Sequence, residues 1–490
     1  MINLKEHLKL TGVYTFFAAF PAILQLIVYP IIEGHDMLGA KDFGYLAVTE
    51  AILSFLVIFC LFGMAVSVAR FFYDFCDEKQ GYRKLVSTIF LGIIFRAGIV
   101  VALLFVFADF IGSFFPAGPL RNFESYGIYL GIIAFNRAVV ATALSLYRSE
   151  KIVRNFILIS LISGLLRSLF QVIGVLYFDL SFEGYLMGTA LGGGIATILT
   201  LVYIFYRNGL GFSFSIWKQL QFFAASLMLA DVLHWGVMFF DRFMLLSQPI
   251  QLGIYDNAMK FAAGVLFISQ GLAGSVQPEL YRLFKDGIQR NEKSIKAFSN
   301  IFIAETILVV GILALPLIFF IQFFFDTELV LSAGLLMIIM VRFILNAMFQ
   351  VFSWPLLYKK KSGLYFLLNL LTFAVLVIGN LLLVPHMGFY GSITAFLFAG
   401  MVQVVSFYIA QKKIIPIPWN LRKVLYFPVS VVVFAGMVEI AKVQLIIHAV
   451  YSSMLVVLYI LAGIFLLYRN EITDVIRKIL ARLKFRNPVK

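Results

Sequence analysis

The chain alternates between long apolar stretches and short polar connections. Fourteen stretches approach the roughly 20 apolar residues that an α-helix needs to cross a bilayer. Because the connections are brief, the pattern predicts an all-α polytopic membrane protein, with a break at Pro428 in its thirteenth span. The predicted spans lie near residues 11–33, 43–68, 85–110, 126–147, 156–178, 185–206, 222–247, 257–279, 298–324, 332–357, 363–384, 390–410, 424–441 and 449–468.

Lys and Arg are distributed unevenly between alternate connections. The termini and every second connection hold 30 of these residues, whereas the opposite connections hold three, Lys41, Arg121 and Lys442. Because basic loops stay on the cytoplasmic side of a membrane, we expect both termini to lie in the cytoplasm. Topology thus explains the net charge of +14, and we expect no nucleic-acid partner.

The chain also repeats itself at a spacing of six spans. The sequence "GMAVSV" (63–68) matches "GLAGSV" (271–276), and residues 172–190 match residues 377–395. An even spacing gives both halves the same orientation, which is typical of carriers with two lobes around a central cleft. The predicted parts are an N-terminal lobe (1–210), a C-terminal lobe (211–413), two further spans (414–468) and a basic cytoplasmic tail (469–490).

Composition supports a lipid environment and excludes several kinds of chemistry. Of the 490 residues, 62% are apolar and 13% are charged, against roughly 25% charged in soluble proteins. The sequence has no GxxxxGK[ST] phosphate loop, no CxxC pair and no cluster with metal-ligand spacing. We therefore expect a transporter that is not an enzyme and that uses no cofactor or metal, with a proton or sodium gradient as a candidate energy source.

Six basic residues fall inside the predicted spans, where a central charge costs roughly 2.5–3.5 kcal/mol. They are Arg96, Arg137, Arg167, Arg242, Lys260 and Arg342. The carboxylates that can pair with them, or bind a coupling ion, are Glu50, Asp231, Asp241, Asp256 and Glu305. Charges at this depth must face protein or water, so we expect these bases to bind an anionic substrate. Ion pairs that hold helices together are the alternative.

Helical spacing places many of these charges on polar stripes. Asp256 and Lys260 lie four residues apart with the acid first, a spacing that favours pairing. The stripes comprise Ser160, Ser163, Arg167 and Gln171 in span 5, Asp231, His234, Met238, Asp241 and Arg242 in span 7, and Arg342, Asn346 and Gln350 in span 10. Stripes in both halves predict a hydrated central cavity with excess positive charge.

Several segments resemble a known superfamily of exporters. They are "KDFGYLAVTEAI" (41–52), "SVARFFYD" (67–74), "DRFMLL" (241–246) followed by "LGIYDNAMKFA" (252–262), and "GFYGSITA" (388–395). With fourteen spans and the repeat, the chain resembles the multidrug/oligosaccharidyl-lipid/polysaccharide exporter superfamily. Within it, the sequence is similar to the O-antigen and polysaccharide repeat-unit flippases of the Wzx type, which implies a MATE-like fold.

The resemblance implies that undecaprenyl-diphosphate-linked oligosaccharides move from the inner to the outer leaflet of a bacterial cytoplasmic membrane by alternating access. It implies that Arg242 and Lys260, with the midspan arginines, receive the diphosphate or acidic sugars. The implied partners are the lipid-linked oligosaccharide, membrane lipids and the polysaccharide polymerase and chain-length machinery. A lipid II flippase and a multidrug or small amphipathic compound exporter are the alternatives, the latter requiring an acidic or neutral cavity.

Overall fold

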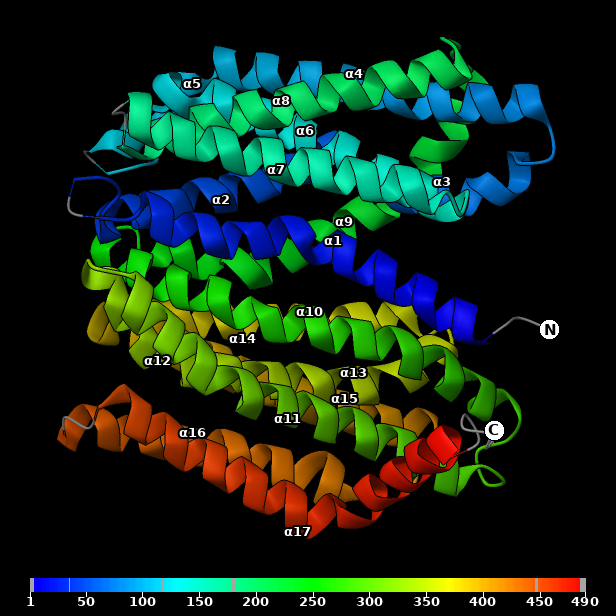
Figure 1. Ribbon diagram of the computed structural model, residues 1–490, viewed down its shortest axis with the longest axis vertical. Coiled ribbons are helices and arrows are strands. Elements are labelled where there is room, and N and C mark those ends of the chain that lie inside the picture. The colour runs from blue at the N-terminus through cyan, green and yellow to red at the C-terminus, as the bar shows by residue number, and fades with distance from the viewer. Residues whose placement is uncertain (1–3, 35, 117, 179–180, 446–447, 485–490) are drawn as a thin grey trace. The chain divides into compact units, whose positions relative to one another are not determined.

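The computed structural model describes residues 4–34, 36–116, 118–178, 181–445 and 448–484. Within these ranges the helices are joined by turns and loops, and the β-structure consists of an isolated bridge between Glu33 and Leu38 (Figure 1). The elements up to residue 244 are α1 (Leu4–Ile32), α2 (Ala40–Leu61), α3 (Met64–Phe75), α4 (Lys79–Val106), α5 (Ala108–Ser113), η1 (Pro119–Arg121), α6 (Phe123–Ser149), α7 (Val153–Phe178), α8 (Ser181–Asn208) and α9 (Phe214–Met244). The later elements are α10 (Pro249–Lys285), α11 (Glu292–Phe324), η2 (Glu328–Leu331), α12 (Ser332–Met340), α13 (Arg342–Tyr358), α14 (Ser362–Met387), α15 (Phe389–Ile414), the π-helical turn η3 (Arg422–Tyr426), α16 (Phe427–Leu445) and α17 (Ala449–Lys484).

Fourteen helical segments in the described ranges are long and apolar enough to cross a membrane. Each coincides with one predicted span, so the prediction of an all-α polytopic fold is confirmed. Next to Pro428, where a break was expected, the π-helical turn η3 passes directly into α16, and the two together form one helical segment, Arg422–Leu445.

Contacts between helices divide the chain into two units. The first comprises residues 1–256 with 325–329, and the second comprises 257–324 with 330–490. Helix α9, which the predicted repeat assigns to the second half, packs within the first unit on α2, α3 and α4. The lobe boundaries taken from the repeat stay a prediction.

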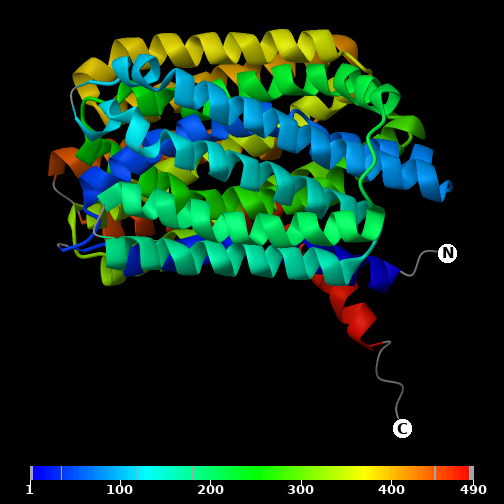
Figure 2. The same cartoon turned by 90° about the horizontal axis from the view of Figure 1, so that it is seen from above.

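Helix α6 is the centre of the first unit, where it contacts α2, α3, α4, α5, α7 and α8 (Figures 1 and 2). Helices α7 and α8 approach each other at backbone distance through glycines. A Cβ on Gly188 would lie 2.0 Å from the Phe170 carbonyl oxygen, and one on Gly192 would lie 2.4 Å from that of Leu166. Small residues thus allow tight packing where apolar side chains face lipid as readily as protein.

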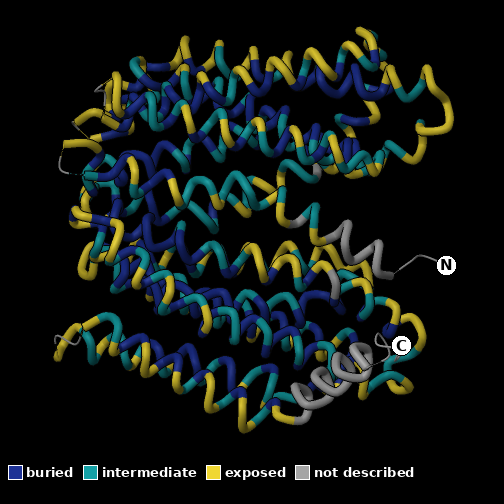
Figure 3. Tube along the Cα trace, viewed as in Figure 1, coloured by how far each residue is buried: buried dark blue, intermediate teal, exposed yellow. Residues whose placement is uncertain are grey.

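Helix α7 shows how the unit separates lipid-facing from protein-facing sides (Figure 3). Its exposed large residues follow the helical period and form an apolar stripe: Leu158, Ile162, Leu165, Leu169 and Leu176. The predicted polar stripe of the same helix, which includes Ser160 and Gln171, is turned toward protein instead, and both of these residues are buried. The helix therefore has the two faces expected at the lipid boundary of a membrane protein.

The second unit packs α14 on α15 and α13 on α15, while α16 and α17 cover α11, α12 and α13. A side-chain cluster fastens α16 to its neighbours. Lys442 donates to the Gly334 carbonyl oxygen at 2.5 Å and pairs with Glu439, which also accepts the Tyr390 hydroxyl. The final two spans are thereby bound to the helices of their own unit.

The predicted second span is interrupted, unlike its partner in the repeat. Phe62 and Gly63 both have positive φ, at 45° and 67°, so α2 ends and α3 begins anew. The matching glycine, Gly271, lies inside the uninterrupted helix α10. Similar sequences therefore adopt different backbones, because different residues surround them in the two halves.

Candidate functional site

A bidentate ion pair joins α2 to α6 inside the first unit. Arg137 donates from Nη1 to Oε1 of Glu50 at 2.5 Å and from Nη2 to Oε2 at 2.8 Å. Both residues lie near the middle of their spans, yet their side chains are 32% and 34% exposed. Because exposing charge to hydrocarbon at this depth is costly, the exposure favours a surface that faces water or a polar ligand.

Arg167 of α7 adds a second guanidinium to this surface. Its Nη2 donates to the carbonyl oxygen of Pro21 at 3.1 Å, and it interacts electrostatically with Arg137 and Glu50. Arg167 forms no ion pair with any described residue, and its buried Nε has no hydrogen-bond partner. We call Glu50, Arg137 and Arg167 the Glu50 cluster; its two guanidiniums and one carboxylate carry a net charge of +1.

Proline explains why α1 accepts hydrogen bonds from α7. Pro21 has no N–H, so the carbonyl oxygen of Phe17, four residues earlier, loses its helical partner. The hydroxyl of Ser160 donates to that oxygen. Farther along the same contact, Gln25 donates to Gln171 at 3.2 Å, and Gln171 donates to Thr189 of α8 at 2.9 Å. The polar stripe predicted for span 5 therefore packs against α1 and positions Arg167.

A second charge network, which we call the hairpin network, closes the α9–α10 hairpin. Arg242 contacts Asp241 at 2.8 Å and Asp256 at 2.9 Å, and it also donates to the Met238 carbonyl oxygen at 2.6 Å. Tyr255 donates to the other oxygen of Asp241 at 2.5 Å. Arg242, Asp241 and Asp256 are 6%, 5% and 3% exposed, so this network is buried, in contrast to the Glu50 cluster. Substrate contact by Arg242 stays a prediction.

Arg96 lies at the interruption between α2 and α3. Its Nε donates to the Cys60 carbonyl oxygen at 3.3 Å, an oxygen near the end of α2. Its Cζ lies 5.4 Å from the Phe62 ring and 5.0 Å from the Trp217 ring, which are cation–π distances. These contacts hold the two positive-φ residues in place.

The remaining predicted residues lie on α9, α10, α11 and α13. On α9, Asp231 and His234 are exposed on one face and interact electrostatically. In the second unit, Lys260 on α10 and Glu305 on α11 are half-buried. Arg342 is buried at the start of α13, where it donates to the Met259 sulfur at 2.8 Å and lies 3.7 Å from the centroid of the Phe396 ring. Ion coupling by the acids is untested.

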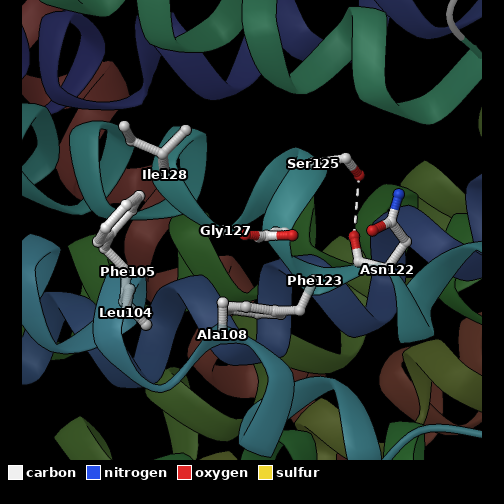
Figure 4. A pocket seen from close by; sticks show the side chains of 9 residues that line it. Leu104, Phe105, Ala108, Asn122, Phe123, Ser125, Gly127 and Ile128 are labelled. Atoms are coloured by element: carbon white, nitrogen blue, oxygen red, sulfur yellow. Dashed lines mark hydrogen bonds between the residues drawn. The ribbon is translucent and has the colours of Figure 1, made fainter.

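A pocket of about 390 Å³ lies outside these networks, where the end of α4 meets α5 and the start of α6 (Figure 4). Phe105, Ile128 and Phe123 give it an apolar lining, and Ser125 donates to the Asn122 carbonyl oxygen at 2.9 Å beside it. None of the predicted site residues lines it. Within the described residues, no group of three or more His, Cys, Asp or Glu could hold a metal ion.

Sequence patterns missed several residues that complete these networks. Gln25 is the one amide side chain in the predicted first span, a signal that could have placed it in a contact with another helix. Tyr29 and Tyr185 interact electrostatically with Arg167, but an aromatic residue in a span carries no such signal. Glu33, at the end of α1, is buried through contacts with residues almost 300 positions later, which no local pattern predicts.

Fourteen apolar helices and charged groups near midspan define a multi-pass membrane protein. No family model matches the sequence, and no curated protein matches it. Solved structures do match. The lipid II flippase MurJ in an inward closed conformation has a TM-score of 0.66 at 15% identity, covering 94% of this chain and 99% of that chain.

Two other matches are transporters of the MOP superfamily. An inward-facing multidrug resistance MATE family transporter has a TM-score of 0.62 at 12% identity, covering 80% of this chain and 94% of that chain. A MOP superfamily transporter from Pyrococcus furiosus has a TM-score of 0.56 at 13% identity, covering 83% and 94%. The chain therefore has a MATE- and MurJ-like fold, and the predicted MATE-like architecture is confirmed.

Proposed function

We propose that the chain is a flippase for undecaprenyl-diphosphate-linked oligosaccharide repeat units, working by alternating access in a bacterial cytoplasmic membrane. Such a lipid has a charged, sugar-bearing headgroup that cannot cross hydrocarbon and a tail that will not leave it. A protein that moves it must offer water and positive charge to the headgroup at midspan. The MOP-superfamily fold supports this proposal, since solved members are flippases and exporters.

The Glu50 cluster is the observation that carries the proposal. Arg137 and Arg167 interact electrostatically near midspan, and their two positive charges outnumber the single negative charge of Glu50. The side chains of the cluster are partly exposed. Guanidinium groups present planar pairs of donors that match phosphate oxygens. The unpartnered Nε of Arg167 supplies a further donor. A diphosphate at this surface would meet two cations, and Tyr29 and Tyr185 lie close to Arg167.

A lipid II flippase is the second candidate, because the match to MurJ spans 94% of this chain, whereas the matches to the MATE family transporter and the Pyrococcus furiosus transporter span 80% and 83%. Lipid II carries the same undecaprenyl diphosphate, so the Glu50 cluster suits either substrate. A multidrug exporter of cations is disfavoured, since the Glu50 cluster has more positive than negative groups. Proton or sodium coupling and contact with polymerase machinery remain proposals of the same kind.

The proposal is tested by flipping in proteoliposomes. Fluorescent undecaprenyl-diphosphate oligosaccharide, fluorescent lipid II and a fluorescent organic cation are compared with wild-type protein, Arg167→Ala, Arg167→Lys and Arg70→Ala. Arg70 is a control because it forms an exposed ion pair with Asp74 on α3 of the same unit, at 2.8 Å. Loss of a charged hydrogen bond corresponds to roughly ten- to hundredfold in rate, so we expect Arg167→Ala to slow flipping by that factor.

The expected pattern is fast flipping of the oligosaccharide lipid by wild type and Arg70→Ala, partial activity of Arg167→Lys and slow flipping by Arg167→Ala. Preference for lipid II over the oligosaccharide lipid would replace the first candidate with the second. Movement of the organic cation alone would overturn both. Equal flipping by wild type and Arg167→Ala would remove the Glu50 cluster from the substrate path.

A further inference from the structure

Glu33 is a buried carboxylate at the end of α1, where a negative charge does not help its own helix. The residue directly follows α1, is 4% exposed, and its N–H continues the helical pattern by donating to the Tyr29 carbonyl oxygen at 3.1 Å. Because the C-terminal end of a helix carries partial negative charge, an acid there is unfavourable. A buried acid in this place therefore needs donors from elsewhere in the fold.

Both of its oxygens accept backbone N–H groups from a distant segment. Oε1 accepts the N–H of Thr327 at 2.6 Å, and Oε2 accepts that of Asp326 at 3.1 Å. These donors immediately precede η2, so the carboxylate lies at the N-terminal end of a helical segment, where negative charge is favourable. A carboxylate accepts hydrogen bonds from backbone N–H groups more strongly than a neutral side chain does.

The segment that Glu33 holds is unusual in its place in the fold. Residues 325–329 belong to the first unit, although α11 before them and α12 after them belong to the second. Phe325, Thr327 and Leu329 are 3%, 5% and 0% exposed, whereas Asp326 and Glu328 between them are exposed. The segment is therefore anchored by alternate side chains and by its backbone, and Glu33 supplies the polar part of that anchor.

The start of α10 is bound to the first unit in a comparable way. A Cβ on Gly253 would lie 1.9 Å from the Ala40 carbonyl oxygen, and one on Gly44 would lie 1.9 Å from that of Pro249. Helix α10 thus touches α2 at backbone distance in residues 249–256, and its remaining residues belong to the second unit. Ala40 begins α2 and follows the turn that starts at Glu33. Two connections into the second unit are thus anchored near the α1–α2 turn.

We propose that Glu33 is a latch, which holds the connector between α11 and α12 against the end of α1 and must release it when the transporter changes conformation. In the predicted orientation this turn lies on the outer side of the membrane. Its role in transport rests on the proposed function, whereas the latch contact does not. Substitution that removes one acceptor oxygen or the charge should free residues 325–329.

Thiol labelling measures release of the segment without any substrate. In a background with Cys60→Ala and Cys76→Ser, Thr327→Cys reports on the latch, because residue 327 is buried and its backbone N–H, the actual donor, is retained. The rate of maleimide labelling of Thr327→Cys in detergent is compared among three proteins, which carry Glu33, Glu33→Gln or Glu33→Ala. The matched control is Glu124→Gln, which changes an exposed carboxylate in the first turn of α6.

We expect labelling of Thr327→Cys to accelerate about tenfold or more in both Glu33 variants, since two charge-assisted hydrogen bonds are weakened. Glu124→Gln should leave the rate unchanged. Equal rates with Glu33 and Glu33→Gln would overturn the latch. If the Glu33 variants do not fold, amide hydrogen exchange of the wild-type protein provides the test. Slow exchange of the Asp326 and Thr327 amides supports the latch. Exchange as fast as in an unstructured peptide overturns it.

Flipping assays of the same variants separate the latch from the proposed function. If wild-type protein flips no lipid while labelling still depends on Glu33, the proposed function fails and the latch stands. If wild type flips lipid and labelling is independent of Glu33, the latch fails and the proposed function stands.

Discussion

Arg137 donates hydrogen bonds to both carboxylate oxygens of Glu50, with nitrogen–oxygen distances of 2.5 and 2.8 Å, across the α2–α6 contact. The pair remains about one-third exposed at midspan. The pair therefore connects the central helix α6 to α2. It also fixes the orientation of the Arg137 guanidinium in the Glu50 cluster. A residue that both stabilises and binds can be tested only when stability and transport are measured together.

The first prediction concerns this pair. Removing Glu50 alone leaves Arg137 without its carboxylate, so Glu50→Gln should destabilise the protein by about 1–3 kcal/mol. The double variant Glu50→Gln/Arg137→Gln should be less destabilised than the sum of the single variants, because neither charge is then left unpaired. Thermal unfolding of the wild type, both single variants and the double variant is measured in detergent and monitored by size-exclusion chromatography, which gives the coupling energy of the pair. Additive effects would show that the two side chains are not coupled.

The second prediction concerns Arg242. Two buried carboxylates depend on this guanidinium, so Arg242→Ala should lower stability by about 3–5 kcal/mol and reduce the yield of folded protein. Lys260→Ala changes a half-buried residue and should have a smaller effect. Yield and unfolding temperature of the two variants are compared at equal expression. An Arg242→Ala protein as stable as wild type would show that the hairpin network contributes little to folding.

Gly63 provides the third prediction. Its φ of 67° is unfavourable for a residue with a Cβ, and that Cβ would lie 3.3 Å from Leu227. Gly63→Ala should therefore cost about 1–2 kcal/mol. Gly98→Ala on α4 is the control, because nothing lies within 4 Å of its Cβ position, and alanine favours a helix by about 0.5–1 kcal/mol there. Opposite shifts in unfolding temperature are expected; equal shifts would contradict the interrupted span.

The fourth prediction concerns the contact between Pro21 and α7. Ser160→Ala should cost about 1 kcal/mol, because the Phe17 carbonyl oxygen then loses its donor. In a Pro21→Ala background the restored N–H can donate to that oxygen, so the same substitution should cost much less. Ser163→Ala, which removes a hydroxyl bonded within its own helix, is the control. A cost of Ser160→Ala that is independent of Pro21 would refute this account of the stripe.

Much of the architecture is already encoded in local sequence. Apolar length marks all fourteen membrane-length helical segments of the described residues, because a lipid environment demands about 20 such residues whatever the neighbours are. The midspan bases were recognisable for the same reason, since their insertion cost makes them stand out. Periodicity also assigned Ser160, Arg167 and Gln171 to one face of α7, as observed.

Tertiary structure decided which of those charges meet. Asp256 binds Arg242, fourteen positions earlier, because the α9–α10 hairpin folds one helix onto the other. Gly63 interrupts a helix and Gly271 does not, since only the first has Arg96 and Trp217 nearby to stabilise the interruption. Glu33 acquired its role from a segment almost 300 residues away. Sequence determines where charge enters the membrane, and packing determines whether that charge is buried in a network or exposed for binding, because partners distant in sequence supply the compensating hydrogen bonds.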